Sequence, residues 1–252
     1  MNNDIFKRAN HNLVLLSENI YPGRGIIVGM DETGEYLVQL YWIMGRGENS
    51  RNRIFITGDD YSVATVAVDP SKVEDPNLIF YTAMAQQNLR SQGRASGDIY
   101  VVSNGHQTMD AISYLQLDEA IKKWEYEPDS PNFTPRITAR FKNIYSAEMF
   151  STEISILKKS PVSRICYRTL FNPTLKAGFG YCITTYSGDG NPLPSFEGEP
   201  YLLPLLGNIE TVTNTVWDAL NEENRVSLAV KFIKISKEET ILRIINKYTA
   251  VV

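Results

Sequence analysis

The chain of 252 residues contains only two cysteines and two histidines. Cys166 and Cys182 lie far apart and form no CxxC motif, which favours two reduced, buried thiols over a disulfide framework. A zinc site built around His11 and His106 would need an unusual set of additional ligands. The composition therefore predicts a protein without a metal centre and without disulfides.

Long apolar runs are also missing, so no segment is a candidate for a membrane span. The N-terminal region lacks the basic and then apolar pattern of a secretion signal. Lys and Arg number 25 against 29 Asp and Glu, which gives a formal net charge of −4. That balance argues against nucleic-acid and anionic-membrane partners, because both favour basic surfaces. We expect a cytoplasmic enzyme or binding protein.

Several well-known motifs are absent as well. The sequence has no Walker A motif, no HExxH and no dinucleotide fingerprint, and it shows no internal repeat or low-complexity segment. The Pro-, Gly- and Asn-containing stretches at 129–132 and 189–192 are typical of loops and not of domain linkers. A chain of this length can bury a core without staples, so we expect a single domain over residues 1–252.

What the sequence does contain is many short β-rich runs. A hairpin is indicated by Asp31–Glu35, where Gly34 suits a positive φ between two apolar runs. Along Val226–Phe232 the alternation of apolar and polar residues predicts a strand with one buried face. The expected strands are Gly25–Met30, Tyr36–Met44, Arg53–Thr57, Ser62–Val68, Leu78–Ala85, Ile99–Ser103, Thr138–Phe141, Glu148–Leu157, Arg164–Leu170, Gly178–Tyr186 and Val226–Phe232.

Helical patterns are fewer. An apolar stripe predicts a helix over Ile209–Leu220, and a capping box at Ser236–Glu239 predicts a final helix with an isoleucine-rich face through Tyr248. A further helical region covers about Thr108–Trp124, and the first twelve residues are frayed or form a short helix. Many strands joined by short turns, with few helices, indicate an α+β fold with two packed antiparallel sheets covered by helices.

Four arginines concentrate between Tyr21 and Phe55. Arginine is a planar cation suited to phosphate or carboxylate, and glycine lets backbone N–H groups approach an anion. A solvated surface is the usual place for any single arginine, but four beside glycines at strand ends indicate an anion pocket. The residues concerned are Arg24, Arg46, Arg51 and Arg53, interleaved with Gly23, Gly25, Gly45, Gly47, Asn49 and Asn52.

Two further segments carry candidate chemistry. In Val102–Asp110 a buried strand runs into a glycine turn and a helix, where Thr108 is a plausible N-cap and His106 a possible acid–base group. A capped turn with an incidental histidine is an equally good interpretation. Farther along, Glu127 and Arg136 bracket a proline-stiffened loop, although on composition alone Glu127 would be a solvated surface group.

Taken together, the arginine segment, the turn within Val102–Asp110 and the loop from Glu127 to Arg136 resemble the archaeal-type IMP cyclohydrolases. They occur in the same order within about residues 21–137, and the stretch Met44–Arg53, MGRGENSRNR, is similar to the bacterial branch of the family. The C-terminal third carries no such motif. The motifs are YxGR at Tyr21–Arg24, Asn52-Arg53, the turn Asn104-Gly105-x-x-Thr108-x-Asp110, and YExD…TPRI from Tyr126 to Ile137.

The resemblance implies a four-layer αββα sandwich of the N-terminal-nucleophile hydrolase type, without that superfamily's chemistry. Met1, Asn2 and Asn3 agree with this, because none of them is a Ser, Thr or Cys nucleophile. The implied reaction is the last step of purine nucleotide synthesis. In it the carboxamide nitrogen of 5-formamidoimidazole-4-carboxamide ribotide attacks the neighbouring formamide carbon, and water leaves to give IMP.

The resemblance also implies roles for particular residues. Arg53 would stabilise the formyl oxygen or the phosphate, Glu127 would be the proton-transfer base, and Tyr81 would relay a proton. Because the segment Gly47–Arg51 is longer than in the archaeal form, the sequence leaves open whether Arg51 or Arg53 faces the ligand. The expected substrate-binding residues are Arg24, Arg46 and Arg136 for the phosphate or ribose, and Asn104 and Thr108 for the base or phosphate.

Three functional hypotheses follow. The first is a cyclohydrolase that acts on a purine ribonucleotide without metal or redox cofactor, without nucleic acid or membrane, and as a homo-oligomer whose size the sequence does not fix. The second is a nucleotide-binding module that keeps the pocket but has lost activity. The third, an amidohydrolase with an N-terminal nucleophile, is disfavoured by the Met1–Asn3 start.

Overall fold

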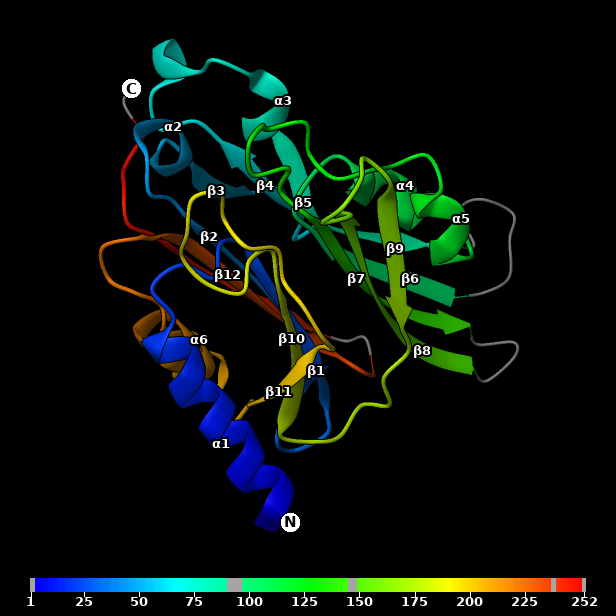
Figure 1. Cartoon of the computed structure of the whole chain (residues 1–252). Helices are drawn as coiled ribbons and strands as arrows, with labels where there is room; N and C mark the ends of the chain where they lie inside the picture. Colours follow the sequence, from blue (N-terminus) through cyan, green and yellow to red (C-terminus); the bar gives the residue numbers. More distant parts are fainter. Residues whose placement is uncertain (1–2, 90–96, 145–148, 237–238, 251–252) are drawn as a thin grey trace.

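Two antiparallel β-sheets form the centre of the structure (Figure 1). The computed structural model describes residues 3–89, 97–144, 149–236 and 239–250. Sheet A has six strands, in the order β11 (Tyr201–Pro204), β10 (Phe179–Thr184), β1 (Gly25–Met30), β2 (Tyr36–Met44), β12 (Arg225–Lys234) and β13 (Thr240–Asn246). Sheet B has seven, in the order β3 (Ile54–Thr57), β4 (Val63–Val66), β5 (Tyr81–Asn88), β6 (Gly97–Ser103), β7 (Arg136–Ile144), β8 (Met149–Lys159) and β9 (Cys166–Phe171).

The sheets face each other, and helices cover their outer faces. One apolar cluster lies between the sheets and takes residues from both, for example Tyr41 of β2 and Phe141 of β7. A second joins sheet A to α1 (Asn3–Glu18) and α6 (Ile209–Ala219), and a third joins sheet B to α4 (Gln107–Ser113) and α5 (Leu117–Ile121). Figure 1 shows the two helix pairs on opposite sides of the molecule. The expected α+β class with two antiparallel sheets is therefore confirmed.

Strand β2 shows why the central strands are almost entirely apolar in sequence. Side chains alternate between the two faces of a strand, and in β2 both faces are covered. Leu40 and Trp42 pack toward the helices, whereas Tyr41 and Ile43 pack between the sheets. A strand at the centre of a layered fold therefore needs an almost unbroken hydrophobic run, which fixes its register strongly.

Strand β12 differs from the prediction of one buried face. Its residues are buried on both sides, with Leu228 and Val230 toward the helices and Ala229 and Ile233 between the sheets. Val226 also points between the sheets, because the register with β2 shifts near the start of the strand. Such a β-bulge adds a residue and moves the following side chains to the other face, which the alternation alone did not reveal.

The expected C-terminal helix is wrong. Residues Thr240–Asn246 form the edge strand β13, in which Ile245 pairs with Leu228 of β12. Three of its residues are β-branched isoleucines, which pack well on a pleated surface and lose side-chain freedom in a helix. Two positions of the proposed capping box, Lys237 and Glu238, lie outside the described residues.

Other boundaries also shifted. The region near Thr108–Trp124 holds two short helices instead of one, and the N-terminal helix is longer than expected. Leu78 belongs to the short helix α3 (Pro76–Ile79), which Asp75 caps through the backbone N–H of Asn77, so β5 starts later than predicted. The helix over Ile209–Ala219 is confirmed, whereas β11 was not anticipated. Among the described residues, no helix is both long and apolar enough to cross a membrane.

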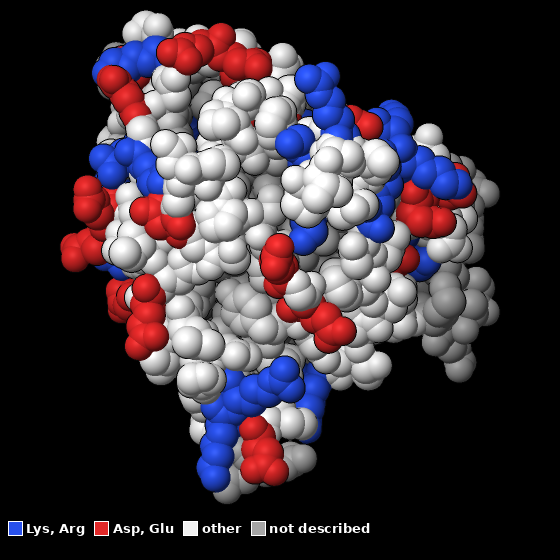
Figure 2. All heavy atoms as spheres, in the orientation of Figure 1, with Lys and Arg blue, Asp and Glu red and all other residues white. Residues whose placement is uncertain are grey.

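The state of the two cysteines and the distribution of surface charge agree with what the sequence predicted. Cys166 and Cys182 are free and buried, and burial raises the pKa of the Cys182 thiol to about 12. Figure 2 shows one face of the molecule, on which acidic and basic side chains are mixed and no broad basic area appears. Met1 and Asn2, which entered the argument about a terminal nucleophile, lie outside the described residues.

Gly25 offers a test of the close packing between β1 and β2 of sheet A. It pairs with Trp42 across β1 and β2, and a Cβ atom at Gly25 would lie 1.9 Å from Trp42 Cζ2. Trp42 is fully buried and its indole N–H donates to Gly23 O at 3.0 Å, so the ring has no room to move. We predict that Gly25→Ala lowers the free energy of unfolding by about 1–3 kcal/mol, measured by urea denaturation.

Gly188→Ala is the matched control. A Cβ atom there would meet its nearest neighbour, Asn19 Oδ1, at 3.9 Å, which is an ordinary contact. We expect its stability to stay within about 0.5 kcal/mol of the wild type. Equal stability of the two variants would contradict the close approach of Gly25 to Trp42.

Candidate functional site

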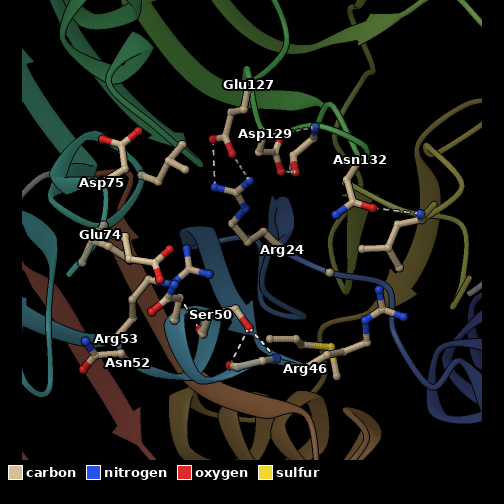
Figure 3. Close-up of a pocket in the computed structure, with 18 of the residues that line it drawn as sticks. Arg24, Arg46, Ser50, Asn52, Arg53, Glu74, Asp75, Glu127, Asp129 and Asn132 are labelled. Atoms are coloured by element: carbon tan, nitrogen blue, oxygen red, sulfur yellow. Dashed lines mark hydrogen bonds and ion pairs between the residues drawn. The ribbon is translucent and has the colours of Figure 1, made fainter. Parts of the chain in front are cut away.

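A cavity of about 330 Å³ opens where the segments that lead into β1, β3 and β7 meet (Figure 3). Because β1 belongs to sheet A while β3 and β7 belong to sheet B, both sheets contribute to its wall. Its charged lining residues are Arg24, Arg46, Arg53, Lys72, Glu74, Asp75, Glu127 and Asp129. Its other polar or aromatic lining residues include Tyr21, Asn49, Ser50, Asn52, Asn132, Thr134 and Tyr186.

A buried ion pair between Arg24 and Glu127 forms one side of the cavity (Figure 3). Arg24 Nη1 donates to Glu127 Oε1 at 2.9 Å and Nη2 donates to Oε2 at 2.6 Å. Nη1 also donates to the carbonyl of Asn104 at 3.0 Å. Burial by itself lowers the pKa of Arg24, but Glu127 together with Tyr81 and Tyr41 outweighs that effect, and this pKa is raised well above its usual value. The sequence predicted both residues for the site, and the structure brings them together.

Arg136 contacts the same Glu127 carboxylate from the side that faces away from the cavity lining. Its Nη1 lies 3.6 Å from Glu127 Oε1 and donates to Gln107 Oε1 at 3.2 Å. Its guanidinium lies over the Trp124 ring, 5.1 Å from the centroid. Burial lowers the pKa of Arg136, partly offset by Glu127. Arg136 is not among the residues that line the cavity, and it contacts the Glu127 carboxylate from outside the lining.

Among the described residues, Arg53 is the arginine of this cavity that forms no ion pair. It is buried, and its Nε donates to the carbonyl of Ser50 at 3.2 Å. In the part of the chain that the structure describes, no ion pair involves Arg53. Arg51 instead donates from Nε to the carbonyl of Gly45 at 2.9 Å and lies 3.7 Å from Glu223, outside the cavity. The structure thus places Arg53, and not Arg51, in the cavity wall.

Arg46 lies at the rim. It is partly exposed, forms an ion pair with Asp189 and stacks over the ring of Tyr21, 5.0 Å from the centroid. Its charge is therefore shared with a neighbouring carboxylate before any ligand arrives.

Three predicted site residues lie behind the cavity wall. Tyr81 is buried and its hydroxyl lies 2.6 Å from that of Tyr41, whose pKa is raised well above its usual value by burial and by Tyr81. Asn104 donates to Pro135 O at 2.8 Å and accepts from Ile137 N at 2.8 Å. Both side chains hold the turn and the strands together, and neither lines the cavity.

Thr108 is the third of these residues, and its expected role as N-cap is wrong. The N-cap of α4 is His106, and the buried Thr108 hydroxyl donates to Gly105 O at 2.9 Å and contacts Ser103 Oγ. The N-cap therefore lies two residues earlier than the threonine pattern indicated. His106 has its Nε2 3.1 Å from Asn77 O and is likewise absent from the cavity lining.

Sequence reasoning missed a second polar group in the cavity. Asp129, Thr134 and Tyr186 all line it, and they are joined through the Thr134 hydroxyl. Asp129 stands two residues after Glu127 in the YExD motif, which was an available signal. Tyr186 follows β10 and carries no motif. Glu74 and Asp75, on the loop before α3, also gave no sequence signal.

The groups that line this cavity are of the kinds that bind anions and transfer protons. The Arg53 guanidinium, a buried carboxylate and several hydroxyl and amide groups surround a space large enough for a small anionic ligand. Within the described ranges, no three His, Cys, Asp or Glu side chains converge in a way that could hold a metal ion.

Comparison with known proteins gives one match. Neither the curated proteins nor the solved structures compared with the chain match it. The model of one family, described as IMP cyclohydrolase-like protein, matches residues 21–239. That range includes every charged residue that lines the cavity. Since the match covers well over half of the chain, the protein belongs to the IMP cyclohydrolase-like family.

Proposed function

We propose that the protein is an IMP cyclohydrolase, which closes the ring of 5-formamidoimidazole-4-carboxamide ribotide to IMP with loss of water. The observation that carries the proposal is the pairing of two features in one cavity: the buried Glu127 carboxylate and the Arg53 guanidinium, which forms no ion pair among the described residues. Membership of the family supports the same reaction. Both reacting groups belong to one molecule, so holding them in contact supplies much of the rate acceleration.

Arg53 is the proposed anchor for negative charge. A guanidinium without a counterion at a buried position favours an anion, and its fork can hold two phosphate oxygens. The same group can instead stabilise the formyl oxygen as negative charge develops there. Asn49, Ser50 and Asn52 line the cavity on the same segment and add hydrogen-bonding partners for a ribose or a phosphate.

Glu127 is the proposed proton-transfer base. Arg24 occupies one hydrogen-bonding position on each of its oxygens, and a carboxylate oxygen has a second lone pair that can accept a proton. The bidentate contact fixes the orientation of the carboxylate, which proton transfer requires. We assign the positioning of Glu127 to Arg24 and Arg136, and the outer contact with the substrate to Arg46.

We further propose that the layers of helices and sheets correspond to the αββα sandwich of N-terminal-nucleophile hydrolases. The order of the layers and the antiparallel sheets support this. The proposed reaction uses no terminal nucleophile.

A purine-nucleotide-binding module without activity remains the alternative. It would keep Arg53 and the cavity but would not need the buried carboxylate. An absorbance assay of the purified protein with the formamido ribotide separates the two. Turnover supports the cyclohydrolase, whereas binding of IMP without turnover supports the module.

Glu127→Gln tests the proton transfer. The amide keeps the shape of the side chain but cannot accept the proton, so we expect turnover to fall on the order of 10²-fold or more. Glu125→Gln is the matched control, because Glu125 is exposed and lies outside the cavity. Titration with IMP and a circular dichroism spectrum establish that the variant is folded. Turnover of Glu127→Gln equal to that of Glu125→Gln would remove Glu127 from the chemistry.

Arg53→Ala tests the anion anchor. Hydrogen bonds to a charged group are worth about 1.5–3 kcal/mol, so we expect IMP to bind about 10- to 100-fold more weakly by calorimetry. Arg51→Ala is the control, since its guanidinium faces Gly45 and Glu223 outside the cavity. An unchanged dissociation constant for Arg53→Ala, with a loss for Arg51→Ala, would reverse the assignment of the two arginines.

A further inference from the structure

The proposed ring closure must move two protons, one from each of two nitrogens. The carboxamide nitrogen loses one hydrogen when it attacks, and the formamide nitrogen loses one when its double bond to carbon forms. The oxygen that departs as water gains both. Glu127 accounts for the first transfer, and a second group in the same cavity that accepts and returns a proton would serve the second.

Asp129, Thr134 and Tyr186 form a connected chain of polar groups on the cavity wall. The Thr134 hydroxyl hydrogen-bonds to Asp129 Oδ2 and lies 2.5 Å from the Tyr186 hydroxyl. The backbone N–H of Thr134 donates to Asp129 Oδ1 at 2.7 Å. Three side chains from two distant segments therefore share one line of hydrogen bonds.

The chemistry of the groups fixes the direction of these bonds. An ionised carboxylate only accepts, so Thr134 must give its one hydroxyl proton to Asp129. The Thr134 oxygen can then only accept from Tyr186, whose proton points along the chain. The Tyr186 oxygen is left with lone pairs that can accept from a ligand, and Asp129 is the final acceptor.

The surroundings suit an acceptor of this kind. Burial raises the pKa of Asp129, with Glu127 adding to that effect, while its contacts with Thr134 and the charge of Arg24 oppose it. Burial also raises the pKa of Tyr186, while its bond to Thr134 and the charge of Arg24 oppose this. The tyrosine thus passes a proton on without remaining ionised, and the carboxylate is a stronger base than an exposed aspartate.

We propose that Tyr186, Thr134 and Asp129 are a proton relay that serves the dehydration stage of the ring closure; the proposal rests on the proposed function. In this stage the N–H bond of the formamide nitrogen breaks, and its electron pair forms the C=N bond of the ring. The C–O bond breaks, and its electron pair stays on the leaving hydroxyl.

The proton of the formamide nitrogen is first taken up by the relay and then returned by the reverse transfers. It passes to Tyr186 Oη while the tyrosine proton passes to Thr134 Oγ1 and the threonine proton passes to Asp129 Oδ2. The reverse movement gives a proton from Tyr186 to the leaving hydroxyl, which departs as water. The relay ends in its starting state, and no oxidant, reductant or further reactant is consumed.

The test compares Thr134→Val with Thr134→Ser. Valine keeps the volume of threonine but breaks the relay, whereas serine keeps the hydroxyl. With the formamido ribotide as substrate, we expect Thr134→Val and Tyr186→Phe each to lower kcat on the order of 10²-fold, with KM and the dissociation constant of IMP within about 3-fold of the wild type. Thr134→Ser should retain most of the activity.

A double variant and a control complete the experiment. If the groups act as one unit, Thr134→Val combined with Tyr186→Phe should lose no more activity than the more damaging single change. Tyr181→Phe, whose hydroxyl contacts Thr174 O outside the cavity, should match the wild type. Thermal melting of each variant shows whether it is folded.

The outcomes separate the relay from the reaction. An active wild type with fully active Thr134→Val and Tyr186→Phe overturns the relay alone. Multiplying losses in the double variant, or equal losses in Thr134→Ser and Thr134→Val, also overturn it, because they indicate structural roles. A wild type that binds IMP without turnover overturns the proposed function, and the relay with it.

Discussion

The ion pair between Arg24 and Glu127 is the interaction on which the site depends. Arg24 stands just before the first strand of sheet A, and Glu127 stands in the loop that leads to β7 of sheet B. The pair therefore links the two sheets at the cavity. Removal of one partner from a buried pair typically costs about 3–5 kcal/mol, because the other charge is left without compensation. The two hydrogen bonds from Arg24 fix the orientation of the Glu127 carboxylate.

Counterions give the arginines of the cavity different properties. Arg24 is paired with Glu127 and Arg46 with Asp189, whereas Arg53 donates to the Ser50 carbonyl and forms no ion pair with any residue that the structure describes. Under the proposed function, the phosphate of the ligand therefore finds its strongest attraction at Arg53. Clustered arginines indicated an anion pocket from the sequence, but their separate roles follow from which carboxylates the fold brings beside them.

The sequence was most informative where local pattern and burial agree. The bounds of β1 and β2 follow from their apolar runs and the glycine turn between them, and Arg24, Arg53 and Glu127 were identified by motif. Thr240–Asn246 was misread because isoleucines spaced for a helix can also pair as an edge strand, and only the neighbouring β12 decides between them.

The sequence also did not reveal which side chains near the cavity reach its surface and which lie behind it. Tyr81 belongs to a strand near the site, yet its hydroxyl is directed to Tyr41 and away from the cavity lining. Tyr186 lines the cavity although it carries no motif, because the end of β10 lies next to the start of β1. Positions along a motif do not say which side chains reach the surface of a cavity, since that depends on how two sheets stack.

Under the proposed reaction, the ion pair also couples proton transfer to charge stabilisation. When Glu127 accepts the carboxamide proton, it becomes neutral and Arg24 is left as a buried cation without its counterion. At that moment negative charge develops on the formyl oxygen, and an anion beside Arg24 replaces the lost carboxylate charge. The cost of discharging Glu127 is thus offset in the transition state and not in the substrate complex. In the proposed reaction Arg24 therefore stabilises the reacting oxygen, and Arg53 binds the phosphate.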